Sequence, residues 1–347
     1  MEHEFLEQGG QYDVERTGPD TYKLSIELPM DPDGMIAREC PSENCLPAYF
    51  KVKPGTGVIG QTEAFCPYCF QKAEPGNFAT TTQADYMEQI GMREALGGVD
   101  RMVKNALDLD SSGRKKIEGG LLSIEISYDP GPLPPLWHPL GEELRRDLIC
   151  PKCGLEHAVF GIAVWCPDCG SDIFLQHVSK EYDVVKLMLS DVDNRRERLG
   201  SRVAARDIEN ALEDTVSIFE AVLRAMTRRR LLLHLPPVDV EEVLKKIGNK
   251  YQSISLAAET ALKELDLPLF ETLNDDEIKT LRVTFEKRHP ITHNLGIVDR
   301  KYLEKVQSGE PEGREVRVAA RDVLHAIDLC FKVITDVYPK VFPSNKV

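Results

Sequence analysis

Two short runs, Cys150-Pro-Lys-Cys153-Gly154 and Cys166-Pro-Asp-Cys169-Gly170, decide how the middle of this chain folds. Each run places two thiols on one tight turn, and two such turns can aim four sulfurs at a single ion. Four sulfurs complete a closed, tetrahedral structural zinc site. A second set of four cysteines lies upstream, at Cys40, Cys45, Cys66 and Cys69. The sequence therefore predicts two four-cysteine zinc ribbons.

The composition is that of a globular protein from a reducing compartment. The chain has 347 residues, of which 42% are hydrophobic and 29% charged. No apolar run approaches the ~20 residues of a membrane helix, and the first residues lack the basic start and apolar core of a signal peptide. We therefore expect a cytoplasmic protein with no membrane contact, in which paired cysteines bind metal. Disulfides or an iron–sulfur cluster are the alternatives, and the ninth cysteine, Cys330, is expected to be a buried thiol.

The net charge of −14 is unevenly distributed along the chain. Residues 1–180 carry 28 acidic and 16 basic side chains, whereas residues 181–347 carry 29 acidic and 27 basic ones. An acidic surface repels a phosphate backbone. The second half is therefore the better candidate for nucleic-acid contact, and the first half is better interpreted as a scaffold or a docking surface for a protein partner.

Turn residues and hydrophobic periodicity predict a multidomain fold in which small β and α/β elements precede an all-α bundle. We expect a first ribbon region over 1–90, a small α/β element with a proline-rich linker over 91–144, a second ribbon over 145–179, and a helical bundle over 180–347. A helix is predicted at about 82–107, with a break near Gly97-Gly98. In the bundle, helical segments are predicted at about 181–199, 202–231, 239–265, 275–290 and 314–338.

The segment with the most chemical potential is Arg288-His289-Pro290-Ile-Thr-His293-Asn294. A guanidinium suits phosphate oxygens, and an imidazole exchanges protons near neutral pH. Together they suffice to cut an RNA strand without a metal ion, since one group assists the ribose 2′-hydroxyl and another neutralises charge on the phosphate.

Geometry constrains this segment. On an ideal helix, Arg288 and His293 lie about 140° apart around the axis. We expect Pro290 to bend or end the helix, because it lacks a backbone donor. The two side chains would then meet either at a kink or across a twofold axis, where each subunit gives half of a composite site.

The segment resembles the signature of HEPN domains, which are small helical bundles. Arg288 would be the motif arginine, His289 its polar follower and His293 the motif histidine, and the resemblance continues through Asn294, Gly296, Asp299 and Tyr302. It covers about residues 180–340 in helical layout, with two N-terminal zinc ribbons as an added module.

The resemblance implies a metal-independent endoribonuclease of toxin or antiviral defence systems, dimeric through its bundle and leaving 2′,3′-cyclic phosphate ends. It implies that Arg288 stabilises the phosphate, that His293 acts as base or acid, and that His289 and Asn294 orient the substrate. A supporting acid would be Glu213 or Glu220. Other members of the family have lost activity and bind RNA, nucleotides or protein partners.

Other interpretations stay open. His289 and His293 are spaced as a metal pair on a helix, although no carboxylate lies between them. The rival function is a non-catalytic adaptor, and a zinc-ribbon transcription-type factor is a third hypothesis that the acidic ribbons disfavour. Arg228-Arg-Arg230 is expected to be a solvated helix face or part of an RNA groove, and His157 and His177 are expected at the surface.

Overall fold

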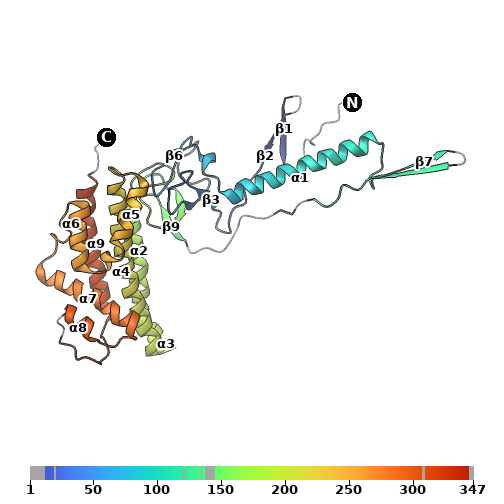
Figure 1. Ribbon diagram of the computed structural model, residues 1–347. Helices are drawn as coiled ribbons and strands as arrows, with labels where there is room; N and C mark the ends of the chain where they lie inside the picture. The colour runs from blue at the N-terminus through green and yellow to red at the C-terminus, as the bar shows by residue number, and fades with distance from the viewer. Residues whose placement is uncertain are drawn as a thin grey trace.

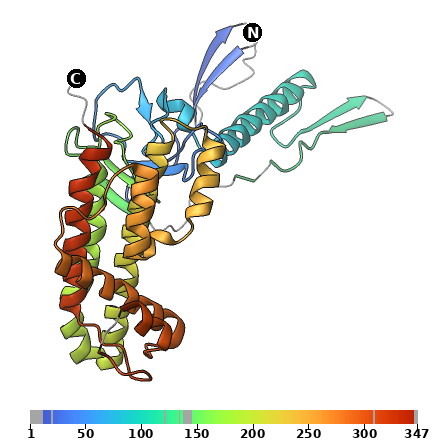
Figure 2. The ribbon, with the colours of Figure 1, turned by 60° about the vertical axis from the view of Figure 1, so that its left-hand side comes forward.

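A computed structural model describes residues 12–18, 21–119, 122–133, 135–136, 145–306 and 309–343 of the chain. It has a strand-rich part that holds both cysteine sets, followed by a helical part (Figure 1). Turning the view shows the helical part as an elongated bundle with the strand-rich part at one end (Figure 2). The second cysteine set thus lies in the middle of the sequence, directly before the helices.

The centre of the strand-rich part is one antiparallel sheet of order β3-β4-β10-β9. Its strands are β3 (Ile36–Glu39), β4 (Tyr49–Val52), β9 (Arg146–Ile149) and β10 (Glu156–Val159). β4 belongs to the first cysteine set and β10 to the second, and Lys51 pairs with Ala158 in their shared register. The sequence predicts two separate ribbons, whereas the structure joins them through this strand pair.

One face of this sheet forms the core of the strand-rich part. Phe50 and Val159 are register partners with 1% and 0% exposure. Phe78 packs edge-on against Phe50, at the end of a short 3₁₀ turn (Pro75–Phe78). A minor two-stranded pair, β5 (Ala64–Phe65) and β6 (Lys72–Ala73), carries the turn with Cys66 and Cys69.

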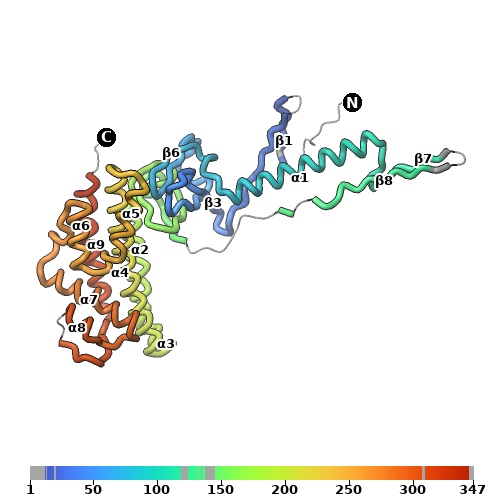
Figure 3. Tube along the Cα trace, in the orientation of Figure 1, coloured from blue at the N-terminus to red at the C-terminus, as the bar shows by residue number. Residues whose placement is uncertain are grey.

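Helix α1 (Thr81–Ala106) projects away from this sheet (Figures 1 and 3). Its start is fixed by a capping box, in which Thr80 Oγ1 accepts the N–H of Gln83 and Gln83 Oε1 accepts the N–H of Thr80. Gln83 Nε2 also donates to Ala37 O on β3. The predicted break at Gly97-Gly98 is wrong, because the helix runs through both glycines.

Two hairpins complete the first half. β1 (Asp13–Gly18) pairs with β2 (Thr21–Ser25), and β7 (Arg114–Gly119) pairs with β8 (Leu122–Ser127) at the far end of α1. The sequence of β8 alternates between apolar and polar residues, which is typical of a strand. The described residues of the proline-rich linker form no regular element.

The helical part is built around α4 (Ser201–Leu231), which contacts most of the other helices. Around it lie α2 (Phe174–Ser190), α3 (Val192–Leu199), α5 (Pro237–Ile247), α6 (Ile254–Leu265), α7 (Asp275–Asn294), α8 (Arg300–Val306) and α9 (Ala320–Val341). The apolar residues of α4 recur at helical spacing, and Leu212, Phe219 and Leu223 are fully buried. Cys330 is also fully buried, as predicted.

Arg229 holds the ribbons against the bundle. Its guanidinium lies 4.3 Å from the ring centroid of Trp165, beside the second cysteine set, and 4.0 Å from that of Phe342 after α9. It also donates to Asp172 Oδ2 at 3.3 Å and to the hydroxyl of Tyr338. One planar cation therefore serves two aromatic faces and two oxygens at the junction.

Replacing Arg229 with alanine is expected to lower the free energy of unfolding by about 2 kcal/mol, since stacked and hydrogen-bonded contacts are lost together. Lysine should not restore it, because an ammonium cannot stack while donating to both oxygens. Urea denaturation followed by fluorescence would measure the loss. Arg230→Ala is the matched control on the next residue, and an equal loss in both variants would contradict the assignment.

Candidate functional site

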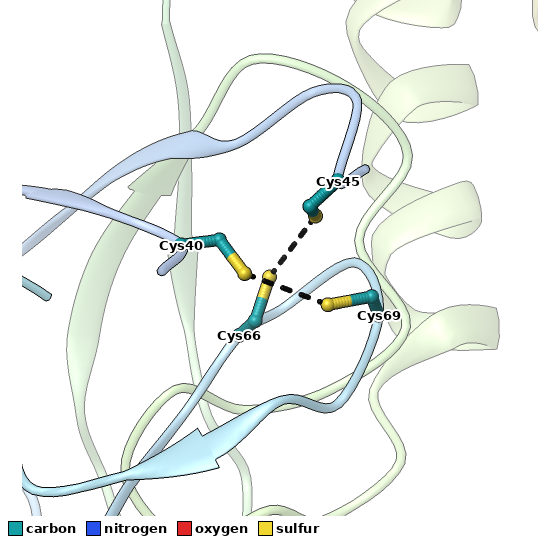
Figure 4. A group of neighbouring side chains, drawn as sticks. All are labelled: Cys40, Cys45, Cys66 and Cys69. Carbon is teal, nitrogen blue, oxygen red and sulfur yellow. Dashed lines mark hydrogen bonds between the residues drawn. The ribbon is translucent and has the colours of Figure 1, made fainter. Parts of the chain in front are cut away.

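The first cysteine set converges on one point. Cys40 and Cys45 lie between β3 and β4, and Cys66 and Cys69 lie on the β5–β6 turn. The four side chains point toward one another (Figure 4), with Sγ–Sγ distances of 3.6 Å for Cys40–Cys69 and for Cys45–Cys66. Sulfurs at the corners of a zinc tetrahedron lie about 3.8 Å apart, given a Zn–S bond of about 2.3 Å. The spacing suits zinc and is far too long for disulfides.

The second set repeats this geometry. Cys150 and Cys169 have sulfurs 3.7 Å apart, and Cys153 and Cys166 have sulfurs 3.6 Å apart. Within each set, all four sulfurs lie within 4.8 Å of one another. The two groups are therefore compatible with two structural zinc sites, in which four protein ligands leave no coordination position for a substrate.

The turns that carry the cysteines share one backbone shape. In three of them, the residue after the second cysteine has a positive φ and donates its N–H to the carbonyl of the first cysteine, namely Phe70, Gly154 and Gly170. Glycine adopts this conformation without strain. In the first set this residue is a phenylalanine and not a glycine, although the φ of Phe70 is also positive, at 64°. Its ring stacks on Phe65 and packs against Trp165, so it gives contacts that glycine would not.

The turn around Cys150 favours the thiolate that zinc requires. Burial raises the pKa of Cys150, but hydrogen bonds from Ser171 and from the backbone N–H groups of Cys153 and Lys152 lower it to about 7. Ser171 Oγ lies 3.4 Å from the sulfur of Cys150 and 3.0 Å from that of Cys169. The protein therefore supplies donors to the metal ligands besides the ligands themselves.

Two histidines expected at the surface are buried instead. His157 and His177 are both fully buried, between β10 and α2. His177 Nδ1 accepts the N–H of Ala163 at 2.9 Å, so its proton lies on Nε2, which is 3.5 Å from Glu181 Oε1 without forming a hydrogen bond. Burial lowers the pKa of His157 to about 4. Position 177 falls on the apolar face of α2 with Phe174, Val178 and Tyr182, and this periodicity was the signal available in the sequence.

The Arg288–Asn294 segment forms the last turns of α7, which does not end at Pro290 as predicted. The helix continues to Asn294 and stops where Leu295 and Gly296 take positive φ angles. The N–H groups of both residues donate to Pro290 O, which gives this end a local cap. Ile291 is buried at 6% exposure, and its burial stabilises the helix beyond Pro290.

Arg288 is held by an amide and not by a carboxylate. Its Nη2 donates to Gln252 Oε1 at 2.7 Å, and Gln252 Nε2 donates to Glu220 Oε2 at 2.6 Å. The acid on α4 thus orients the arginine through an uncharged side chain. The positive charge keeps its capacity to bind an anion, which a direct ion pair would reduce.

The second candidate acid also reaches α7. Glu213 Oε1 accepts a hydrogen bond of 2.8 Å from the hydroxyl of Thr292, the residue before His293. Glu213 and Glu220 are seven residues apart, so both lie on the face of α4 that meets α7. The two acids therefore support different parts of the segment. Glu220 accepts a hydrogen bond from Gln252, which holds Arg288, and Glu213 accepts one from Thr292, next to His293.

The two imidazoles lie together on α7, since the ring centroids of His289 and His293 are 5.0 Å apart with an interplanar angle of 57°. His293 is exposed, and His289 is half-buried. Burial lowers the pKa of His289, and the positive charge of Lys301 on α8 lowers it further. No hydrogen bond joins Arg288 to His293 in the described part of the chain, in keeping with their separation of about 140° on a regular helix.

The residues after His293 stabilise the backbone. Asn294 Nδ2 donates to Ile297 O at 2.9 Å, which closes the turn beyond α7. Asp299 Oδ1 accepts the N–H of Tyr302 at the start of α8, and Tyr302 is buried at 1% exposure. Asn294, Asp299 and Tyr302 therefore have structural roles in this turn that require no substrate.

The environment of His289 predicts its titration. Because its pKa is lowered, His289 should be mostly neutral at pH 7 and should gain its proton only below its ordinary value of about 6.5. Removing the charge of Lys301 with Lys301→Ala should move the pKa upward, which NMR titration of the ring protons would measure. Lys279→Ala, near the other end of α7, is the control, and an unchanged His289 titration in Lys301→Ala would contradict this account.

The comparisons with known proteins leave the family open. No protein-family model, curated protein or solved structure matches this chain. Among the described residues, no helix is long and apolar enough to span a membrane. The function must therefore be argued from the residues and contacts above.

Proposed function

We propose that the helical part is a HEPN-type, metal-independent endoribonuclease and that the two four-cysteine sites hold structural zinc. One observation carries this proposal: Arg288 is oriented by Gln252 instead of being neutralised, on the same helix end as His289 and His293. A free positive charge and two proton-exchanging rings are what phosphodiester cleavage by the 2′-hydroxyl requires.

In this mechanism His293 takes the proton of the ribose 2′-hydroxyl, or returns one to the departing 5′-oxygen. The 2′-oxygen attacks phosphorus and the bond from phosphorus to the 5′-oxygen breaks. The products are a 2′,3′-cyclic phosphate and a 5′-hydroxyl. Arg288 stabilises the charge on the phosphate oxygens. His289, neutral at pH 7, orients the RNA, and Asn294 supports the turn that positions His293.

The setting we propose is a toxin or antiviral defence system, in the cytoplasm, with RNA as the substrate. The acidic ribbon half would bind a protein partner, and the active unit would be a dimer formed through the bundle. The large exposed side chain of Leu295, at 92% exposure beside His293, supports a contact surface at this end of α7.

A non-catalytic adaptor is the second candidate function. It is favoured by the net charge of −14, which weakens loose RNA binding, and by the structural contacts of Asn294. In that case Arg288 and the two histidines would bind a nucleotide or a protein partner without cutting RNA.

The deciding experiment is cleavage of a mixed RNA substrate in EDTA, in brief, cold incubations that spare the structural zinc. Wild-type protein is expected to leave 2′,3′-cyclic phosphate ends, and His293→Ala is expected to leave the RNA intact. His325→Ala is the matched control, since His325 is an exposed histidine beside the opposite end of α7. Equal cleavage by wild type and His293→Ala would exclude this site, and no cleavage by a folded wild type would favour the adaptor.

A further inference from the structure

The projecting half of α1 buries few of its side chains against the rest of the described chain. The side chains that α1 buries, Gln83, Tyr86 and Ile90, all lie in its first ten residues, and beyond them only Gly98 is buried. A segment of about 16 residues is marginal as an isolated helix in water. Gly91, Gly97 and Gly98 lower its helix propensity further.

The same segment exposes a row of large apolar side chains. Met92, Leu96, Val99 and Met102 have exposed fractions of 51%, 42%, 45% and 51%. Monomeric proteins seldom expose an apolar stripe of this length along one helix, and such a stripe marks an interaction surface.

The spacing of the stripe identifies the kind of surface. Met92, Leu96, Val99, Val103 and Ala106 follow one another at intervals of four, three, four and three residues. This is the alternation of a and d positions in a coiled coil, whose partner is another helix with the same spacing. We propose that α1 pairs with α1 of a second copy of this chain, in an antiparallel coiled coil centred between Gly97 and Gly98.

In this register the stripe matches itself. Leu96 of one copy packs against Val99 of the other, and Met92 packs against Val103. On one flank, Ala95 faces Met102, so a small side chain meets a large one. These residues together form the α1 seam, which covers Met92, Ala95, Leu96, Val99, Met102 and Val103.

The flanking charges favour the antiparallel orientation. Arg93 and Asp100 both fall at e positions of the heptad, and Asp100 pairs with Lys104 of its own helix at 2.9 Å. Antiparallel pairing sets Arg93 of one copy opposite Asp100 of the other on both sides of the twofold axis. In a parallel pair Asp100 would instead face Ala95. Flanking charges set partner choice and orientation in coiled coils.

The α1 seam is distinct from the bundle surface proposed above. α1 and α8 lie in different parts of the molecule, with the ribbons between α1 and the bundle (Figure 1). In the antiparallel pair, the two Thr81 residues would stand about 50 Å apart along the axis. The bundles of the two copies would therefore be held far from each other.

Sedimentation velocity on the full-length, zinc-loaded protein tests this. The wild type is expected to form larger assemblies than the double variant Leu96→Glu/Val99→Glu, which keeps only the contact proposed through the bundle, and the dissociation constant of the α1 contact is expected to rise by about 100-fold. Asn105→Glu adds one charge to α1 away from the seam and should leave it unchanged. A wild type whose assemblies are no larger than those of the double variant, even at high micromolar concentration, would overturn the proposal.

Disulfide trapping under mild oxidation tests the orientation. An equimolar mixture of Leu96→Cys and Val99→Cys chains is expected to yield the 96–99 crosslink between unlike chains, whereas each variant alone should yield little. A strong crosslink in Leu96→Cys alone would indicate parallel pairing and overturn the register. Cys330→Ser is included in every chain, and circular dichroism of the variants confirms that the bundle is folded.

Discussion

Replacing Cys166 with serine is expected to leave one zinc ion per chain where the wild type holds two, and to unfold the second ribbon. Cys166 is fully buried, and its sulfur lies 3.6 Å from that of Cys153. Structural zinc contributes roughly 10–16 kcal/mol to the folding of small zinc domains. That is comparable to the whole net stability of a typical domain, which is about 5–15 kcal/mol. Loss of one ligand should therefore open the ribbon.

Metal analysis of the purified protein would count the zinc, and limited proteolysis would locate new cleavage sites between β9 and α2. Cys330→Ser is the matched control, because Cys330 is equally buried but belongs to neither set. Cys45→Ser should remove the other zinc ion. A wild type with fewer than two zinc ions, or a Cys166→Ser variant that keeps both, would contradict the assignment.

The Cys166→Ser substitution should unfold the ribbons more than the helical bundle. The ribbons share a sheet through β4 and β10, so unfolding the second ribbon removes the strand partner of the first. The bundle has its own buried core around Phe219 and Phe285. Far-UV circular dichroism of Cys166→Ser should therefore retain most of the helical signal, while the contact of Trp165 with Arg229 is lost.

The local parts of this fold could be predicted from the sequence, because their signals are local. Two thiols on a tight turn define a metal knuckle, and the period of apolar residues defines α4 and α9. Asn274 and Glu277 form the capping box that the acidic start of α7 indicates. The pairing of β4 with β10 could not be predicted from local signals, since it joins four-residue strands more than 100 positions apart.

Two helices run through residues that were expected to interrupt them. Each glycine in α1 costs only about 1 kcal/mol relative to alanine, so Gly97-Gly98 weakens the helix without ending it. Pro290 removes one hydrogen bond of α7, but Ile291 is buried and the cap after Asn294 holds the last turn. In α7 the deciding contacts are tertiary, and they are not visible in the local sequence.

The candidate site shows the same division. Arg288 and His293 could be selected from residue chemistry and spacing. The role of Gln252 could not, because it lies in a short 3₁₀ turn (Lys250–Gln252) far from α7 in sequence. The buried positions of His157 and His177 were also missed, since a polar side chain is by itself a poor guide to burial.

Arg288→Ala and His293→Ala are each expected to lower RNA cleavage by about 10²–10⁴-fold, because one removes phosphate stabilisation and the other proton transfer. On a continuous α7 the two side chains diverge by about 140°. The proposed site therefore takes Arg288 from one subunit and His293 from its partner. Mixing the two inactive variants should restore about a quarter of wild-type activity, since half of the dimers are mixed and each holds one intact site.

The mixing experiment separates the possibilities sharply. If both variants are inactive and the mixture stays inactive after subunit exchange, the site lies within one chain. If His293→Ala alone retains full activity, the proposed site is wrong. The restoration should persist when every chain also carries Leu96→Glu and Val99→Glu, because α1 pairing holds the bundles of two copies apart. Loss of restoration in that background would mean that the α1 seam is itself needed to assemble the active pair.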